Sequence, residues 1–203
     1  MADEKLDTQV RKEQIAAAAL ELVASQGIKR LNMAAIARRV GLVPSGIYRH
    51  FKSKDEVLDA VLELLRARLM ANVATAREES ADPLERLHGL LTRHVRLIRE
   101  GRAFPRIIFS DEMFENHSER QARVKGILAQ YLAEIGRLVQ EGQQQGQICA
   151  DVPPQTAAMM FMGIIIPAGI LWHLTDGGFN VTQHAGRAWQ MLYAALTGRR
   201  SGS

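Results

Sequence analysis

Residues 32–51, NMAAIARRVGLVPSGIYRHF, decide the fold of this chain. Ahead of Gly41 the apolar residues recur at helical spacing, which predicts a short amphipathic helix. Gly41 itself can take the left-handed conformation that a tight turn requires. After this glycine, Ile47 and Phe51 lie one helical turn apart, so a second short helix buries one of its faces. Two short helices joined by a glycine turn are typical of a DNA-binding helix-turn-helix.

The positive charge of the chain is concentrated around the same stretch. Residues 1–54 contain ten Lys and Arg against five Asp and Glu, whereas residues 55–203 contain sixteen against seventeen. Within residues 28–54 no acidic residue occurs. Such a run forms either a solvated charged face or a focused positive field that binds a polyanion. The cations of this acid-free segment are Lys29, Arg30, Arg38, Arg39, Arg49, Lys52 and Lys54.

The second helix of the motif has a polar face opposite its apolar one. Hydroxyl and cationic side chains gather there, and this mixture suits the base edges and phosphates of a major groove about 12 Å wide. We therefore expect this face to contact DNA. Its members are Ser45, Tyr48, Arg49 and Lys52.

Helical spacing continues along the rest of the chain, and no stretch shows the alternation of a β-hairpin. We therefore predict an all-α protein of about nine helices. Start signals support this interpretation, among them the capping pairs Ser53 with Glu56 and Ser118 with Gln121. Asp82 ahead of Pro83 and Asn180 ahead of the last helix are further predicted caps. The expected helices cover residues 8–26, 33–40, 44–51, 54–78, 83–100, 103–115, 119–145, 154–175 and 181–197.

The last two expected helices are unusually apolar. Residues 157–172 contain no charge, but this run is shorter than the roughly 20 residues that span a bilayer, and Pro167 interrupts it. We therefore expect no membrane insertion and a helix buried on every side. Two such helices in succession indicate either a subunit interface or an intramolecular core, and the sequence leaves both open.

Signals of catalysis are missing from the sequence. It contains no Gly-rich phosphate loop, no nucleophile elbow and no zinc signature, so we expect no enzymatic activity, no cofactor and no metal site. The single cysteine, Cys149, cannot form an internal disulfide. The charged N-terminal residues lack the apolar segment of a secretory signal. We accordingly expect a reducing, cytoplasmic location.

One family shares these features over about 45 residues. Residues 15–58 resemble the N-terminal domain of the TetR (tetracycline-repressor-like) family of transcriptional regulators. The resemblance implies DNA-binding residues 8–68, with the helix-turn-helix at 32–51, followed by ligand-binding and dimerisation residues 69–203. The matching positions are Ile15, Gly27, Ile36, Ala37, Gly41, Ile47, Tyr48, His50, Phe51, Ser53, Lys54, Val57 and Leu58.

The same resemblance implies roles for individual side chains. Tyr48, His50 and Lys54 would contact backbone phosphates, and Asn32 would cap its helix. Arg49 would either grip a guanine through its fork or contact phosphate only. The full set of predicted DNA-binding residues is Asn32, Pro44, Ser45, Gly46, Tyr48, Arg49, His50, Lys52 and Lys54.

Two positions depart from the family pattern. Val43 replaces the Ser or Thr that caps the recognition helix in many relatives, so that cap must come from elsewhere or be absent. Ala34 stands where some relatives have a base-contacting Arg. These departures affect individual contacts and the operator sequence.

The family resemblance also implies a homodimer formed through residues 154–197 and a palindromic operator that a small molecule vacates. The effector would be mostly apolar, because Met and aromatic residues are frequent after residue 55 and either line a cavity or form plain helical core. We therefore predict a ligand-responsive repressor; the alternative is an all-helical carrier with vestigial DNA affinity. The predicted ligand-binding residues are Phe104, Phe109, Met113, Met159, Met162 and Trp172.

Overall fold

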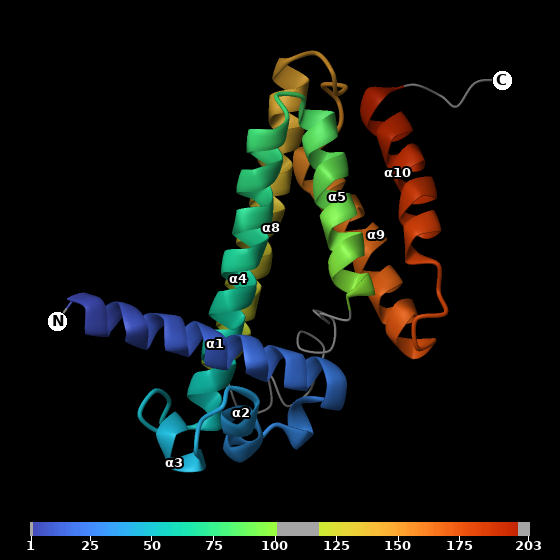
Figure 1. Cartoon of the computed structure of the whole chain (residues 1–203). Helices are drawn as coiled ribbons and strands as arrows, with labels where there is room; N and C mark the ends of the chain where they lie inside the picture. The colour runs from blue at the N-terminus through green and yellow to red at the C-terminus, as the bar shows by residue number, and fades with distance from the viewer. Residues whose placement is uncertain (1, 101–117, 199–203) are drawn as a thin grey trace. The chain divides into compact units, whose positions relative to one another are not determined.

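The protein is all-α, as the sequence predicts. A computed structural model describes residues 2–100 and 118–198 (Figure 1), and no strand occurs within these two ranges. The helices are α1 (Ala2–Gln26), the 3-10 helix η1 (Ile28–Arg30), α2 (Met33–Arg39), α3 (Pro44–Ile47), α4 (Lys54–Glu79), α5 (Pro83–Arg99), α8 (Ser118–Gln144), α9 (Pro154–Leu174) and α10 (Val181–Thr197).

Most predicted helix ends lie within one residue of the observed ones, but three elements differ. Helix α1 begins at Ala2 instead of residue 8, and η1 was not predicted. Helix α3 ends at Ile47 and not at Phe51, because the amides of Arg49 and His50 donate to the carbonyls of Gly46 and Ile47, three residues back, and tighten the chain into a turn. The predicted helix 103–115 lies outside the described residues.

Two helices begin at predicted caps, whereas α8 begins at Ser118, the residue predicted to cap it. The carboxylate of Asp82 accepts hydrogen bonds from the amides of Leu84 and Glu85, at 2.8 and 3.3 Å. The side chain of Asn180 accepts from the amide of Gln183 at 3.0 Å. Each cap satisfies amides that the first turn of a helix leaves unpaired, so local sequence fixes where these helices begin.

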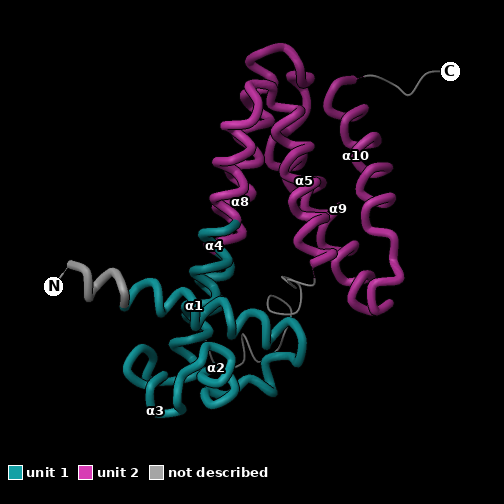
Figure 2. The backbone as a smooth tube through the Cα atoms, viewed as in Figure 1, with its two compact units in different colours: residues 1–68, 102–125 teal, residues 69–101, 126–203 magenta. Residues whose placement is uncertain are grey.

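The chain divides into two compact units (Figure 2). The first contains described residues 2–68 and 118–125, and the second contains 69–100 and 126–198. Residue 68 is also the predicted end of the DNA-binding part. The first two turns of α8, however, belong with the N-terminal unit, so the chain returns to that unit after leaving it.

The core of the first unit is built from helices α1, α2 and α4 and the short α3. Ile15 and Val23 of α1, Ile36 of α2 and Ile47 of α3 are fully buried. Gly27, with φ of 82°, ends α1 and turns the chain into η1. The apolar stripe of α1 therefore anchors the small helices of the motif.

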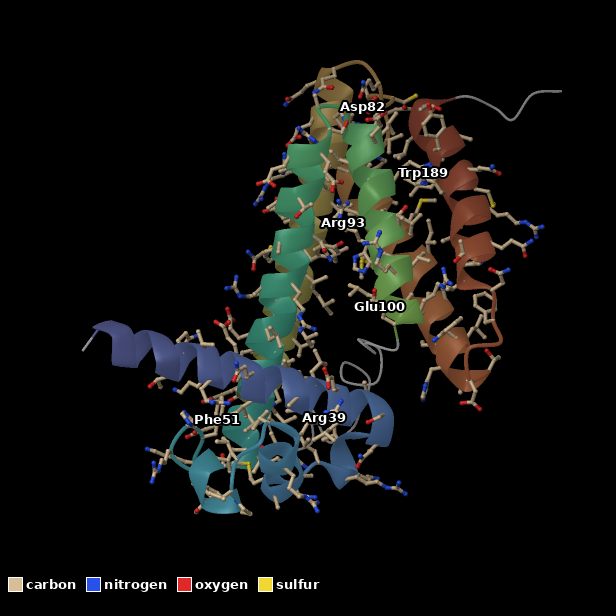
Figure 3. All side chains as sticks on the ribbon, in the orientation of Figure 1. Arg39, Phe51, Asp82, Arg93, Glu100 and Trp189 are labelled. Atoms are coloured by element: carbon tan, nitrogen blue, oxygen red, sulfur yellow. The ribbon has the colours of Figure 1, made fainter. Side chains whose placement is uncertain are left out.

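The second unit packs α5, α9 and α10 against one another (Figure 1). Its core contains Leu87 of α5, Leu138 of α8, Phe161 of α9 and Leu196 of α10, each no more than 1% exposed. The rings of His88 and Trp189 stack between α5 and α10, with centroids 5.1 Å apart (Figure 3). These contacts join the four helices into one apolar core.

A carboxylate shared by two arginines ties α4, α5 and α8 together in the second unit. Glu141 of α8 accepts from Nη1 of Arg77 at 2.8 Å and from Nη1 of Arg86 at 2.9 Å. The side chain of Arg86 also donates through Nε to the carbonyl of Ser80 at 2.7 Å. These groups are partly buried, so solvent screens them less than it screens surface ion pairs.

Helix α9 is buried on one face only, which differs from the prediction of burial on every side. Met159 is 60% exposed, Met160 51% and Leu174 72%, whereas Ala158 and Phe161 are buried. The helix continues through Pro167 without interruption. Among residues 2–100 and 118–198, α9 is the one helix long and apolar enough to cross a membrane. The core helix of a soluble protein meets the same two criteria of length and apolar composition.

Helix α8 ends where the following loop folds back onto a glycine. A Cβ added to Gly142 would lie 2.5 Å from Cδ1 and 2.8 Å from Cγ1 of Ile148, and Ile148 is itself buried. We expect Gly142→Ala to lower the free energy of unfolding by about 1–3 kcal/mol, because the loop must move away. Urea denaturation followed by circular dichroism measures this change.

Gly126 is the matched control on the same helix. It is exposed, and a Cβ added there meets no atom within 4 Å. Gly126→Ala is therefore expected to raise the free energy of unfolding by about 0.5–1 kcal/mol through the better helix propensity of alanine. Equal effects of the two substitutions would contradict the close approach of Ile148.

Candidate nucleic-acid interface

Helix α2 is positioned by its cap and by the turn that follows it. Oδ1 of Asn32 accepts from the amide of Ala35 at 2.8 Å, and its Nδ2 donates to the carbonyl of Arg30 at 3.2 Å. Asn32 thus caps the helix as predicted. Gly41 has φ of 70°, the left-handed region predicted for the turn. The local sequence therefore explains how the chain reverses between α2 and α3.

Helix α3 is short and is held from one side. Ile47 is fully buried and Phe51 is 5% exposed, while the ammonium of Lys12 lies 5.8 Å from the centroid of the Phe51 ring (Figure 3). Pro44 occupies the first turn, and Val43 makes no side-chain capping bond, as its apolar side chain predicts. The core contacts of Ile47 and Phe51 replace the missing cap in holding α3.

The opposite side of this segment is exposed. Tyr48 is 55% exposed, and Ser45, Arg49 and Lys52 are exposed with it. Pro44 is exposed too, whereas Gly46 and His50 are half-buried. The predicted polar face is therefore accessible to a partner.

Several exposed cations of the first unit have no carboxylate partner among the described residues. Arg30, Arg38, Arg49 and Lys52 are exposed and form no ion pair with any described residue. Arg39 differs, because its guanidinium binds Glu21 of α1 at 2.8 Å. Four uncompensated cations on a small unit create the positive field that a polyanion requires.

The predicted phosphate contacts Lys54 and His50 have different surroundings in the structure. The ammonium of Lys54 donates to the carbonyl of Ile28 at 2.9 Å, so it holds the C-terminal side of the motif to η1. Nδ1 of His50 is buried and has no hydrogen-bond partner. Lys54 therefore contributes to the architecture of the first unit as well as to its charge.

The predicted effector residues fall into three groups. Phe104, Phe109 and Met113 lie outside the described residues. Met162 and Trp172 are half-buried in α9. Met159 lies on the exposed face of α9, at 60% exposure.

A buried polar pair lies within the second unit, and sequence reasoning missed it. Nε2 of His94 on α5 and the hydroxyl of Tyr131 on α8 share a hydrogen bond, and the ring of Phe161 lies edge-on to His94. Burial lowers the pKa of His94 to about 4 and raises the pKa of Tyr131. His94 is consequently neutral in the folded protein at neutral pH.

The sequence did contain a signal for this pair. His94 continues the apolar spacing of Leu87 and Leu91 on α5, so the period alone places its ring inside the core. Arg120 is a second missed residue, buried on α8 at the spacing of its apolar stripe. In both cases periodicity indicates burial but cannot name the partner.

No described group of side chains forms a metal site. Within residues 2–100 and 118–198, no three His, Cys, Asp or Glu side chains are close enough to hold a metal ion. The exposed face of the motif offers cationic and hydroxyl side chains to a partner.

Comparisons with known proteins agree with this geometry. The family model described as "Bacterial regulatory proteins, tetR family" matches residues 15–61, and that of the "Tetracyclin repressor-like, C-terminal domain" matches residues 80–196. The fatty acid metabolism regulator protein of Bacillus subtilis (strain 168) is 23% identical over 183 residues, which are 90% of this chain and 94% of that protein. The nucleoid occlusion factor SlmA of Vibrio vulnificus (strain YJ016) is 23% identical over 187 residues, or 92% and 95%.

Solved structures share the fold. FadR from Bacillus halodurans superposes with a TM-score of 0.74 at 22% identity, covering 90% of this chain and 94% of that one. SmeT, the repressor of the Stenotrophomonas maltophilia multidrug efflux pump SmeDEF, gives 0.73 at 21% identity over 97% and 94%. Bacillus subtilis FadR in complex with stearoyl-CoA gives 0.73 at 23% identity over 90% and 98%. Because both family models match and together cover most of the sequence, the chain belongs to the tetR family of bacterial regulatory proteins.

Proposed function

We propose that this chain is a homodimeric repressor that binds a palindromic DNA operator through α3 and the turn that follows it, and that a mostly apolar effector releases it. One observation carries the DNA-binding part of the proposal. Arg30, Arg38, Arg49 and Lys52 are exposed in the same unit as the exposed Tyr48, and none of them forms an ion pair with a described carboxylate. A carrier gains nothing from such a field, whereas phosphate binding depends on it. The cytoplasm, where the chromosome lies, is the corresponding compartment.

Within this interface the side chains have different proposed tasks. Arg49 reads a base, because its exposed fork can grip O6 and N7 of guanine. Tyr48 and Lys52 contact phosphates and set the position of the protein on the duplex. Lys54 adds charge while its ammonium holds η1.

The proposed dimer interface is the exposed apolar surface of α9 and α10. Met159, Met160, Leu171 and Leu174 of α9 are between 41% and 72% exposed in the single subunit, and Met191 of α10 is 76% exposed. Helix α9 contains no Asp, Glu, Lys or Arg. An apolar patch built on two adjacent helices is typical of a subunit interface. Met159 belongs to this surface.

The proposed effector site lies in the second unit. The B. subtilis relative was solved with stearoyl-CoA, and we propose an apolar effector here as well. Met162 and Trp172 are half-buried on α9, and His94 with Tyr131 supplies polar atoms in the same unit. Phe104, Phe109 and Met113 complete the proposed set. Addition of such an effector to the protein–operator complex is expected to lower the fluorescence anisotropy of the labelled DNA.

The experiment that tests DNA recognition starts from genomic fragments that the purified protein retains at physiological salt. A palindrome recovered in this way is labelled, and its affinity is compared with that of a shuffled sequence between 50 and 200 mM salt. We expect Arg49→Ala to weaken binding to the palindrome about 5- to 150-fold and to relax preference at one operator position. Tyr48→Phe should weaken both sequences equally, because it removes a phosphate contact.

Arg39→Ala is the matched control for Arg49→Ala. It removes the same charge from the same unit, but Arg39 is already paired with Glu21. Its effect on both DNA sequences should therefore be small. Weak binding that ignores sequence and depends little on salt would instead support the carrier function.

A further inference from the structure

Arg120, in the first turn of α8, is one of the few charged side chains buried in the described structure. Its side chain is 4% exposed, and its guanidinium binds two carboxylates of α4. Nη2 donates to Oδ1 of Asp55 at 2.9 Å, and Nε donates to Oδ1 of Asp59 at 3.2 Å. The fork of the arginine thus spans the first two turns of α4.

These two turns also hold the segment that leaves the recognition motif. Oγ of Ser53 accepts from the amide of Glu56 at 3.2 Å, and the carboxylate of Glu56 accepts from the amide of Lys52 at 2.7 Å. Lys54 binds the carbonyl of Ile28. A displacement of the first turn of α4 therefore displaces the chain directly after Phe51.

Stability does not account for Arg120. Its Nη1 is buried without a hydrogen-bond partner, and an unpaired buried donor is costly. Buried ion pairs are often no more stable than apolar side chains of similar size. The carboxylates would keep contact with water without the arginine, since the side chain of Asp55 is 57% exposed and that of Asp59 33%. The two hydrogen-bonded ion pairs of Arg120 instead hold the first two turns of α4 against the first turn of α8.

We infer that Arg120 is a positioning residue for DNA recognition, which holds the start of α4 and through it the recognition segment. This inference rests on the proposed function of α3 and its turn. The inference adds to the proposed DNA-binding residues one that lies outside the helix-turn-helix motif. Arg120 is 61 positions away from its partner Asp59 in the sequence.

The first test compares Arg120→Met with Arg123→Met. Arg123 is exposed on the same helix and reaches Asp59 only at 3.7 Å, so its substitution removes an equal charge without the fork. We expect Arg120→Met to bind the operator roughly tenfold more weakly than Arg123→Met does. Its urea midpoint should be unchanged or higher, since the unpaired donor is gone. Equal affinities of the two variants, or an affinity loss that merely follows a lower urea midpoint, would overturn the inference.

The second test uses the opposite charge. Asp59→Asn removes a negative charge close to the DNA-binding motif, and charge alone would tighten DNA binding. If Arg120 positions α4 through Asp59, the substitution should instead weaken the affinity for the operator roughly fivefold. Glu63→Gln on the same helix is the control, because Glu63 pairs locally with Arg66 at 2.6 Å and should show the charge effect alone. Tighter binding by Asp59→Asn, to the same degree as by Glu63→Gln, would refute the positioning role.

The outcomes separate this inference from the proposed function. Failure of the unsubstituted protein to prefer any DNA sequence contradicts the proposed function and the inference with it. Sequence-specific binding that both the Arg120 and Asp59 variants retain at full strength contradicts the inference alone. If Arg120→Met does not fold, the sign of the Asp59→Asn effect decides.

Discussion

Met191→Glu is expected to convert the proposed dimer into a monomer. Met191 is 76% exposed on α10 in the single subunit, so a glutamate is tolerated there by the isolated chain. In a dimer the same carboxylate would be buried against the apolar side chains of its partner without a counter-charge. The dissociation constant of the dimer should rise at least about 100-fold, which corresponds to about 3 kcal/mol. Sedimentation velocity over a range of protein concentrations measures this change.

Loss of the dimer has a defined consequence for DNA binding. A palindrome presents two half-sites about 34 Å apart, and a dimer occupies both in one event. The Met191→Glu monomer should therefore lose affinity for the palindrome while it binds a single half-site as the unsubstituted protein does. Ala129→Glu, at an exposed position of α8 outside the apolar surface, is the control and should remain dimeric. Dimers of Met191→Glu at micromolar concentration would place the interface elsewhere.

The second large effect concerns acid stability. Burial lowers the pKa of His94 from 6.5 to about 4, so the unfolded chain binds a proton in a pH range where the folded protein does not. The stabilisation by the neutral ring is complete above pH 6.5 and is lost as the pH falls toward 4. Between pH 7 and pH 5 this single histidine is expected to lower the free energy of unfolding by about 2 kcal/mol. Urea denaturation at the two pH values measures the difference.

His94→Gln isolates this contribution. Glutamine can still pair with the hydroxyl of Tyr131 but does not titrate, so the variant should lose about 2 kcal/mol less than the unsubstituted protein between pH 7 and pH 5. His88→Gln is the control, because His88 is exposed and only its stacking on Trp189 is lost. An identical pH dependence in His94→Gln and the unsubstituted protein would show that His94 is accessible to protons in the folded state.

Local signals explain why so much of the fold is predictable from sequence. Asp82 and Asn180 each cap a helix that starts one residue later, as their positions before apolar runs predict. Glycine at position 41 predicts the turn of the motif because few other residues adopt its φ at low cost. Such signals act within one helical turn and need no knowledge of the rest of the molecule.

The end of α3 and the buried polar groups depend on tertiary contacts. Helix α3 stops at Ile47, where the chain tightens into a turn between the buried Ile47 and Phe51, and helix propensity alone does not predict this end. Arg120 and Tyr131 lie on the apolar stripe of α8, so their burial follows from spacing. Their partners Asp59 and His94 are 61 and 37 positions away in sequence, and periodicity cannot identify them.

Helix α9 shows a different limit of prediction from sequence. Its residues are apolar on every face, so the sequence cannot say which face meets the core of its own subunit. The structure separates the buried Phe161 from the exposed Leu174. The exposed residues of α9, Met159 among them, are the ones that a partner could contact.

The return of residues 118–125 to the first unit limits how this regulator can be taken apart. Residues 1–68 are not a self-contained module, because Val124 and Arg120 contribute buried side chains to the unit from a distant segment. In a chimera that takes only residues 1–68 from another family member, Val124 and Arg120 would pack against side chains that differ from their native partners. Transplanting the operator specificity of one regulator onto the sensor of another therefore requires two grafts, the N-terminal segment together with the first two turns of α8.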